Sequence, residues 1–340
     1  MTDVKCSEKH DTLYHYTSME GFIGIMDTQS LWATHYLNLN DSSEFSRLAP
    51  ILTKLLVPTA KQVVKDLLSK GDLAIKREIK KYGNCHAFVQ RVVNDLVNAP
   101  FDGAFTPING NNYPIFEPFI TSFCSHIKDD EYIRKNGLLS MWRSYGDGGG
   151  VALVFKTAEI EDIIVQERER FGYSFLKIGV VVYETDRELF DSEFDTFIKD
   201  AKEILLQHLS GGSPNLVGYI RLYLDCVSRL KHQAFQEERE VRIVAMPTNV
   251  KGVSPKDLKI NKIRLPDFKD KVKQKLPYLN LFDDGVSRLL PIQKIIVGPH
   301  RDQQERCEQI KRATKSLRNV EVTCSKTPYI EGIVTEQGDG

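Results

Sequence analysis

The residue types and spacing that most favour chemistry occur in one late segment, where Glu238, Glu240 and Arg242 alternate with Val241 and Ile243. Alternate side chains of a β-strand share a face, so a strand here would carry two carboxylates and a guanidinium on one side. Neighbouring carboxylates raise each other's pKa unless a cation offsets their repulsion, and Arg242 is such a cation. A solvated edge strand whose charges prevent aggregation explains the same pattern, and on this segment alone it is the simpler interpretation.

His15 is a second polar group, in the strand-like segment Leu13-Tyr14-His15-Tyr16-Thr17. Thr17 and Glu20 have the spacing of a capping box, which predicts that a helix begins here. Backbone N–H groups at a helix N-terminus often hold polar ligands. Hydrogen bonds to the local backbone explain an isolated histidine equally simply.

The cysteines indicate no metal site. Cys85 and His86 are adjacent, which would suit a nucleophile or a metal ligand, but no second pair lies nearby. We therefore expect helix packing there and no bound metal. The six cysteines include no CxxC pair, which is typical of reduced thiols in a cytoplasmic protein.

The composition favours one large or two modest globular domains, since 41% of the 340 residues are hydrophobic and 27% are charged. Lys+Arg and Asp+Glu both number 46, so a nucleic-acid partner would need a local basic patch. The basic stretches Lys251–Lys262 and Lys269–Lys275 are more simply solvated loops. No signal-peptide core or transmembrane-length apolar run is present, so we expect a cytoplasmic chain without a membrane partner.

The elements around these residues predict an α+β fold in a single domain of residues 1–330. Helical periodicity over about 44–99, interrupted at Pro58 and Gly71-Asp72, predicts a helical lobe on one side of the core. Residues 100–118 form an expected long loop. A β-α-β unit is expected at about 290–326, and residues 331–340 are expected to form a disordered tail.

Several short motifs share an order along the chain. They are Leu13-Tyr14-His15-Tyr16-Thr17-Ser18, Asn40-Asp41-Ser42-Ser43-Glu44, Ser122-Phe123-Cys124, Met141-Trp142-Arg143-Ser144-Tyr145, Phe235 with Glu238-Arg239-Glu240-Val241-Arg242, and Ile296-Val297-Gly298-Pro299. The set resembles a widespread bacterial family of unknown function over most of residues 13–325. Phe235 replaces the tryptophan usual in that family, and Cys124 replaces a frequent serine.

The early histidine before a short helix and the late glutamate on a strand also resemble the ADP-ribosyltransferase superfamily. That resemblance implies a split, mixed β-sheet core with helical insertions, which binds NAD in a cleft. It implies catalytic roles for Glu240, Glu238 and His15, with His15 on a ribose of NAD. It further places these residues around NAD: His15, Tyr16, Thr17, Asn40, Ser122, Trp142, Tyr145 and Arg242. Tyr145 is the first choice for the aromatic that stacks on nicotinamide, and Tyr36 is the second.

The resemblance predicts an NAD-dependent ADP-ribosyltransferase that releases nicotinamide and modifies a protein or nucleic acid. Breaking the nicotinamide bond develops an oxocarbenium ion, which a fixed carboxylate such as Glu240 would stabilise. Glu238 would orient or deprotonate the acceptor. By analogy, the chain would be an effector in anti-phage defence or a toxin–antitoxin system, with a cognate antitoxin or inhibitor as partner.

Other functions stay open at this point. An NAD glycohydrolase would use water in place of the acceptor, and the sequence does not separate the two enzymes. A non-catalytic module that binds a ligand or a partner would retain the fold without the chemistry. A nucleic-acid-processing enzyme that holds Mg²⁺ ranks below these, because no further acidic cluster accompanies Glu238 and Glu240.

Overall fold

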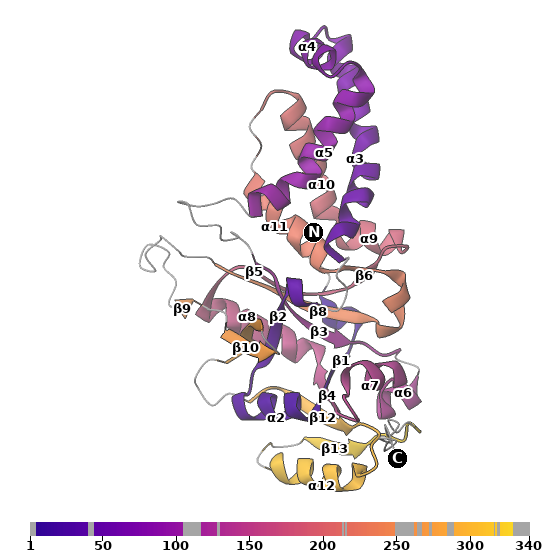
Figure 1. Cartoon of the computed structure of the whole chain (residues 1–340), viewed down its shortest axis with the longest axis vertical. Helices are drawn as coiled ribbons and strands as arrows, with labels where there is room; N and C mark the ends of the chain where they lie inside the picture. Colours follow the sequence, from indigo (N-terminus) through magenta and orange to yellow (C-terminus); the bar gives the residue numbers. More distant parts are fainter. Residues whose placement is uncertain are drawn as a thin grey trace, which may run out of the picture.

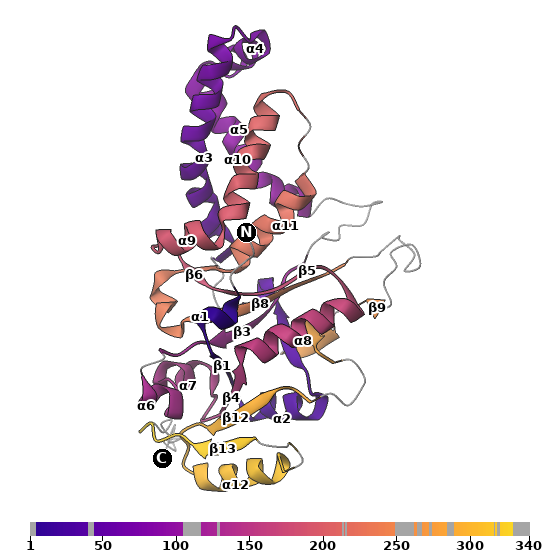
Figure 2. The same cartoon turned by 180° about the vertical axis from the view of Figure 1, so that it is seen from behind.

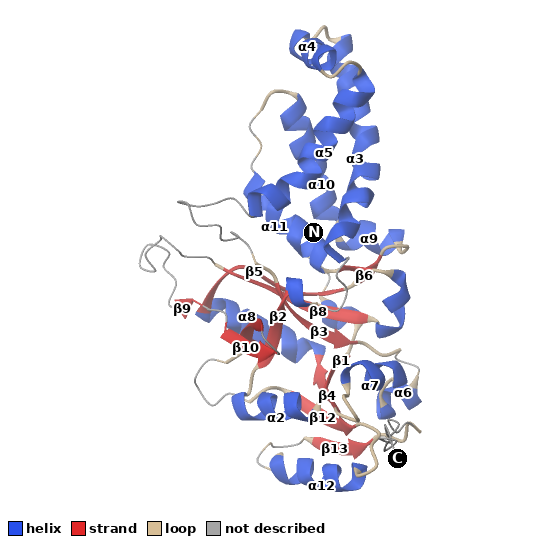
Figure 3. Ribbon diagram, viewed as in Figure 1, coloured by secondary structure: helices blue, strands red, loops and turns tan. Residues whose placement is uncertain are grey.

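The computed structural model describes residues 5–39, 44–104, 117–127, 130–212, 214, 216–248, 262–263, 267–271, 274–283, 289–315, 317 and 320–328. Within these residues, helices surround an 11-stranded sheet that contains both parallel and antiparallel pairs (Figure 1; Figure 3). The predicted α+β class is therefore confirmed.

The strands are β1 (Thr12–Thr17), β2 (Leu31–His35), β3 (Phe119–Cys124), β4 (Val151–Lys156), β5 (Phe171–Val180), β6 (Val182–Tyr183), β7 (Leu230–Lys231), β8 (Glu240–Pro247), β9 (Lys262–Ile263), β10 (Asp267–Lys271), β11 (Gln274–Leu281), β12 (Ile292–Val297) and β13 (Glu321–Cys324). Strands β6 and β7 form a separate parallel pair.

The α-helices are α1 (Cys6–Lys9), α2 (Met19–Thr28), α3 (Glu44–Ser69), α4 (Leu73–Lys81), α5 (Cys85–Ala104), α6 (Glu131–Asn136), α7 (Leu139–Tyr145), α8 (Thr157–Arg170), α9 (Arg187–Glu193), α10 (Asp195–Leu209), α11 (Leu216–Ser228) and α12 (Gln303–Ala313). Two 3-10 helices, η1 (Tyr36–Asn38) and η2 (Gln233–Glu238), complete the described elements.

The sheet divides at β3. One edge of β3 pairs along its whole length with β8, and Ser122 lies opposite Arg242. The other edge pairs with β2 at its start and with β1 at Cys124. From there β1 leads to β4, β12 and β13, whereas β2 leads to β11 and β10. Among the described strands, none pairs with the middle of β3 on this edge.

The two faces of β8 pack against different helices. Val241, Ile243 and Ala245 belong to a core that includes residues of α8 and α12. Val244 and Met246 belong to a second core with helices α3, α5, α10 and α11. These helices project from the sheet as a lobe with α4 at its far end (Figure 1), while α8 lies across the sheet in the reverse view (Figure 2). Alternation places Glu240 and Arg242 on the lobe side of β8.

The predicted helical segments are present, with different boundaries. Pro58 does not interrupt the lobe, because α3 runs from Glu44 to Ser69 with Pro58 inside it. Leu56 before Pro58 and Ala60 and Val64 after it are buried in the lobe core, and this packing offsets the backbone hydrogen bond that proline cannot make. The predicted break at Gly71-Asp72 does occur, and Asp72 caps α4 by accepting hydrogen bonds from two backbone N–H groups. Helix α5 continues through Ala104, so the loop expected from residue 100 begins later.

Other local predictions are confirmed with small shifts. Helix α2 begins one residue later than predicted, since Ser18 rather than Thr17 is its N-cap. Strands β12 and β13 flank α12 and pair in parallel, as expected for the β-α-β unit. The tail at 331–340, residues 105–116 of the expected loop and nearly all of the basic stretch Lys251–Lys262 lie outside the described residues.

No helix in the described ranges is both long and apolar enough to cross a membrane.

Candidate functional site

A cavity of about 300 Å³ lies where the sheet divides. This volume is at the lower end of the ~300–1,000 Å³ range of ligand pockets. The lining residues come mainly from β1, β2, β3, β7, β8 and neighbouring helices, and they are Tyr14, His15, Tyr16, Trp32, Thr34, Asn38, Leu39, Ile120, Thr121, Ser122, Phe123, Cys124, Met141, Tyr145, Lys231, Glu238, Glu240 and Arg242. The cavity therefore brings together residues more than two hundred positions apart.

His15 occupies the divide between β1 and β3. Its Nδ1 lies 3.0 Å from the backbone oxygen of Ser122, in the part of β3 that lacks a strand partner on this edge. A carbonyl oxygen only accepts, so Nδ1 carries the hydrogen and Nε2 is left as an acceptor. Burial lowers the pKa of His15, although the bond to Ser122 opposes this shift. A neutral His15 can therefore accept a hydrogen bond from a ligand hydroxyl.

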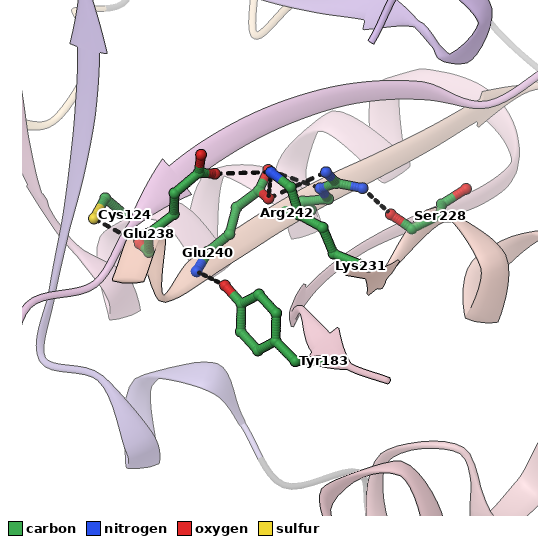
Figure 4. Close-up of polar contacts among 7 residues, drawn as sticks. All are labelled: Cys124, Tyr183, Ser228, Lys231, Glu238, Glu240 and Arg242. Carbon is green, nitrogen blue, oxygen red and sulfur yellow. Dashed lines mark hydrogen bonds and ion pairs between the residues drawn. The ribbon is translucent and has the colours of Figure 1, made fainter. Parts of the chain in front are cut away.

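Four charged side chains, Glu238, Glu240, Lys231 and Arg242, form what we call the Glu240 cluster (Figure 4). Arg242 Nε donates to Glu240 Oε1 at 2.7 Å, and Arg242 Nη2 donates to Glu240 Oε2 at 3.1 Å. Lys231 Nζ bridges the two glutamates, at 2.9 Å from Glu240 Oε2 and 2.7 Å from Glu238 Oε2. The two positive and two negative charges balance.

The two glutamates are bonded to different extents. Two bonds from Arg242 and one from Lys231 fill three of the roughly four acceptor positions of the Glu240 carboxylate. The nearby Ser122 side chain also helps to lower the pKa of Glu240. Glu238 accepts a side-chain hydrogen bond only at Oε2, and its Oε1 has no hydrogen-bond partner among the described residues. The Glu238 side chain is 15% exposed, compared with 5% for Glu240.

The pKa values of these carboxyls move in opposite directions. Burial alone would raise the pKa of Glu240, but the charges of Arg242 and Lys231 lower it to about 2. Burial raises the pKa of Glu238, and Lys231 offsets this shift only in part. Burial would lower the pKa of Lys231, whereas the two carboxylates raise it above its usual value. Glu240 is therefore a fixed negative charge, and Glu238 is the carboxyl better suited to exchange a proton.

Glu238 does not lie on the strand, so the predicted alternation from 238 to 242 is wrong at its first position. Glu238 ends η2, and β8 begins at Glu240. Between them Arg239 has a left-handed backbone with φ of 44°. Its carbonyl accepts hydrogen bonds from Ser125 N at 3.0 Å and Ser125 Oγ at 2.8 Å. This bend returns the Glu238 side chain to Lys231, so the two glutamates still meet.

The structure brings together most of the residues predicted to bind NAD. His15, Tyr16, Ser122, Tyr145, Glu238, Glu240 and Arg242 line the cavity. Thr17 and Trp142 do not line it, nor does the alternative aromatic Tyr36. Asn40 lies outside the described residues.

Trp142 packs behind the cavity. Trp142 is 1% exposed, and its ring meets the Tyr16 ring edge-on with 4.8 Å between the ring centroids. Its Nε1 donates to the Asn136 carbonyl at 3.0 Å. Gly298 lies directly against the indole, where an added Cβ would come within 2.9 Å. The tryptophan and the Gly-Pro segment therefore form one packing unit. The prediction failed here because helical spacing from Tyr145 does not show which side of α7 faces the cavity.

Lys231 is the residue that the sequence reasoning missed. It ends the short strand β7, nine positions before Glu240, and its side chain is 5% exposed. A signal was present, since two close carboxylates call for a cation and Lys231 is one of two cations, with Arg229, shortly before them in the sequence. Sequence spacing alone does not show that β7 returns beside β8.

A second ion cluster packs against the neighbouring strand β5, where Arg229 donates to the Val180 carbonyl. Arg229 donates to both oxygens of Asp225, at 2.9 and 2.8 Å, and to Glu193 Oε2 at 3.0 Å. Lys9 Nζ bonds the other Glu193 oxygen at 2.6 Å. We call these four residues the Arg229 cluster. Burial would raise the pKa of Glu193, but Lys9 and Arg229 lower it.

The described residues contain no group of three or more histidine, cysteine or acidic side chains arranged to hold a metal ion. All six cysteines are free thiols, and Cys124 donates from Sγ to the backbone oxygen of Glu238 at 2.7 Å. Burial raises the pKa of the Cys124 thiol, so this residue is a packing and hydrogen-bonding group at the cavity.

The fold and the site together define a mixed α+β protein with a pair of carboxylates, one of them buried, at the divide of its sheet. Residues 141–243 match a family model described as "Protein of unknown function (DUF2971)". This confirms the resemblance to a family of unknown function over these residues, which include Tyr145, Lys231, Glu238, Glu240 and Arg242 but neither His15 nor Ser122. No curated protein and no solved structure matches the chain. The likeness to ADP-ribosyltransferases stays a prediction.

Proposed function

We propose that the chain cleaves the nicotinamide–ribose bond of NAD and transfers ADP-ribose to a macromolecular acceptor. The observation that carries this proposal is the convergence of His15, Ser122, Tyr145, Glu238 and Glu240 on one cavity. The resemblance to ADP-ribosyltransferases predicts NAD contacts or catalytic roles for these same residues. A sheet divided at β3 also suits the split core that the resemblance implies.

The chemistry assigns different tasks to the two glutamates. Bond cleavage places positive charge on the ribose, and an ionised Glu240, with its pKa of about 2, stabilises that charge. Arg242 and Lys231 use three of the roughly four acceptor positions of Glu240, so a ribose hydroxyl can donate to the fourth without displacing either side chain. Glu238, with the raised pKa and the open oxygen, takes the proton of the acceptor.

The remaining lining residues position the dinucleotide. His15 Nε2 accepts from a ribose hydroxyl, as its fixed Nδ1 bond allows. Tyr145, at the end of α7, stacks on nicotinamide. The proposal includes a cognate antitoxin or inhibitor as partner and a role in anti-phage or toxin–antitoxin systems, both by analogy alone.

The test uses NAD labelled in its adenylate group, incubated with the purified chain and a mixture of bacterial proteins and nucleic acids. Nicotinamide release together with label that stays on a macromolecule after denaturation supports transfer. Release with only free ADP-ribose would replace the transferase by an NAD glycohydrolase. Neither release nor NAD binding by calorimetry would contradict the proposal and favour a non-catalytic binding module.

A further inference from the structure

The outer part of the helical lobe carries an excess of positive charge that the whole chain lacks. Residues 61–91 contain eight Lys and Arg but only three Asp and Glu, although both classes number 46 over the chain. These residues form the second half of α3, all of α4 and the start of α5, with α4 at the end of the lobe farthest from the sheet (Figure 1). The charge is therefore concentrated on a projecting surface.

The cations of this surface are exposed and mostly unpaired. Within the described part of the chain, the side chains of six of them have no hydrogen-bond or ion-pair partner, and these are Lys61, Lys65, Lys70, Lys76, Arg77 and Lys80. Only Lys81 of α4 has a partner, Glu78 at 3.7 Å. We call the group Lys76, Arg77, Lys80 and Lys81 the α4 basic face.

The spacing on α4 is unfavourable for the isolated chain. Lys76 and Lys80, and Arg77 and Lys81, are like charges four residues apart, a spacing that destabilises a helix. Other helices place opposite charges at the same spacing, as in Lys135–Glu131, Lys199–Asp195 and Arg187–Asp191. This chain therefore neutralises its helix surfaces elsewhere, and an anionic partner would neutralise α4.

The geometry of α4 favours phosphates over a lipid surface. A basic helix that lies on a membrane inserts an apolar face between lipids. The apolar face of α4 is already covered, since Ile75 is 6% exposed and belongs to the lobe core together with Ile79. Leu73, at 65% exposed, is the one large apolar side chain within the arc of the basic face. An α-helix is about 10–12 Å wide, which fits the ~12 Å major groove of B-form DNA, whereas the major groove of duplex RNA is too narrow.

We propose that the α4 basic face is a docking surface for duplex DNA, which it binds through the phosphate backbone without sequence readout. This inference is independent of the NAD chemistry, since it concerns a different part of the molecule and requires only binding. It also explains why the charge lies at the end of a projecting lobe, where a long polymer can approach without contacting the sheet.

The test is fluorescence anisotropy of the full chain with a labelled mixed-sequence DNA duplex at several salt concentrations. Four neutralised phosphates predict a log–log slope of about −3.6, or an affinity loss of about 150-fold between about 50 and 200 mM salt. Replacing all four residues of the α4 basic face by Glu should lower the affinity at least about 100-fold. If circular dichroism shows that charge reversal unfolds the lobe, a second variant in which the same four residues are replaced by Gln, a good helix former, takes its place.

The matched control reverses four exposed, ion-paired cations elsewhere: Lys135→Glu, Lys156→Glu, Arg187→Glu and Lys311→Glu. It changes the net charge by the same amount and should retain wild-type affinity within about threefold. An equal loss in the control would overturn the proposal, because bulk charge would then explain binding. So would no binding by the wild type, or tighter binding to duplex RNA or to phosphatidylserine vesicles than to duplex DNA.

Discussion

The Glu240 cluster and the Arg229 cluster each contain one arginine, one lysine and two carboxylates, but only the Glu240 cluster has a carboxylate oxygen without a hydrogen bond. Each buries an arginine, 2% exposed for the Arg242 side chain and 1% for Arg229, that holds a carboxylate through two nitrogens. Each adds a lysine and a second carboxylate. In the Arg229 cluster both oxygens of Asp225 and of Glu193 are bonded, whereas Glu238 keeps an open oxygen.

The surroundings of the two clusters differ accordingly. The Glu240 cluster lines a cavity of about 300 Å³, whereas Glu193 borders a space of about 100 Å³ and neither Arg229 nor Asp225 lines either space. Arg229 also donates to the Val180 carbonyl and lies over the Phe194 ring, so it joins α9 and α11 to the sheet. A buried ion pair by itself is thus no sign of function, and the informative features are an open acceptor and room for a ligand.

The largest expected effect separates stability from chemistry. Asp225→Asn removes the charge that faces Arg229 and should lower the free energy of unfolding by about 3–5 kcal/mol. Urea denaturation measures this change, and nicotinamide release per folded molecule should stay at the wild-type level. A loss of turnover without a loss of stability would place Asp225 in the chemistry and contradict the comparison.

The next effect concerns the open carboxyl. Glu238→Gln keeps the hydrogen bond to Lys231 but removes the proton acceptor, so transfer to the acceptor should fall by about 100-fold. The raised pKa of Glu238 predicts that wild-type activity rises with pH above the ordinary glutamate range, and that this limb of the profile is absent in the variant. The adjacent, exposed Glu237 supplies the matched control, Glu237→Gln, which should behave like the wild type. Equal pH–activity profiles for Glu238→Gln and Glu237→Gln would contradict the role of Glu238 as proton acceptor.

A third effect is the pH dependence of stability. The pKa of Glu240 falls from 4.5 to about 2 on folding, so its contribution is present above pH 4.5 and is lost as the pH falls towards 2. Between about pH 7 and pH 3 the wild type should lose about 2 kcal/mol from this group. Denaturation of wild type and Glu240→Gln at both pH values measures the difference. If the difference were unchanged by pH, Glu240 would not be held ionised by its cations.

The smallest effect tests the ribose contact. His15→Ala removes one acceptor to a ligand hydroxyl and should weaken NAD binding by about tenfold, which corresponds to one hydrogen bond. Calorimetry measures the affinity, and His86→Ala, at an exposed position on the lobe, is the control. Unchanged affinity in His15→Ala would show that His15 only holds β1 against β3.

Period-two alternation predicted part of the site and failed at a defined point. It placed Glu240 and Arg242 on one face of β8, because both residues lie on a regular strand. It failed at Glu238, because a 3-10 turn and the left-handed Arg239 depend on hydrogen bonds from the distant Ser125. Lys231 was missed for the same reason, since only tertiary structure brings β7 to the carboxylates. Local patterns predict elements, whereas contacts between elements depend on chain paths that those patterns do not encode.

The most direct test of the central claim measures nicotinamide release from NAD by wild type, Glu240→Gln and Glu193→Gln side by side. The two variants remove one carboxylate charge from each cluster. Release should fall by a factor of about 10²–10³ in Glu240→Gln, which is the cost of removing one electrostatic stabiliser, and should be unchanged in Glu193→Gln. Equal release by all three proteins, or none by the folded wild type, would contradict the assignment of the Glu240 cluster as the catalytic centre.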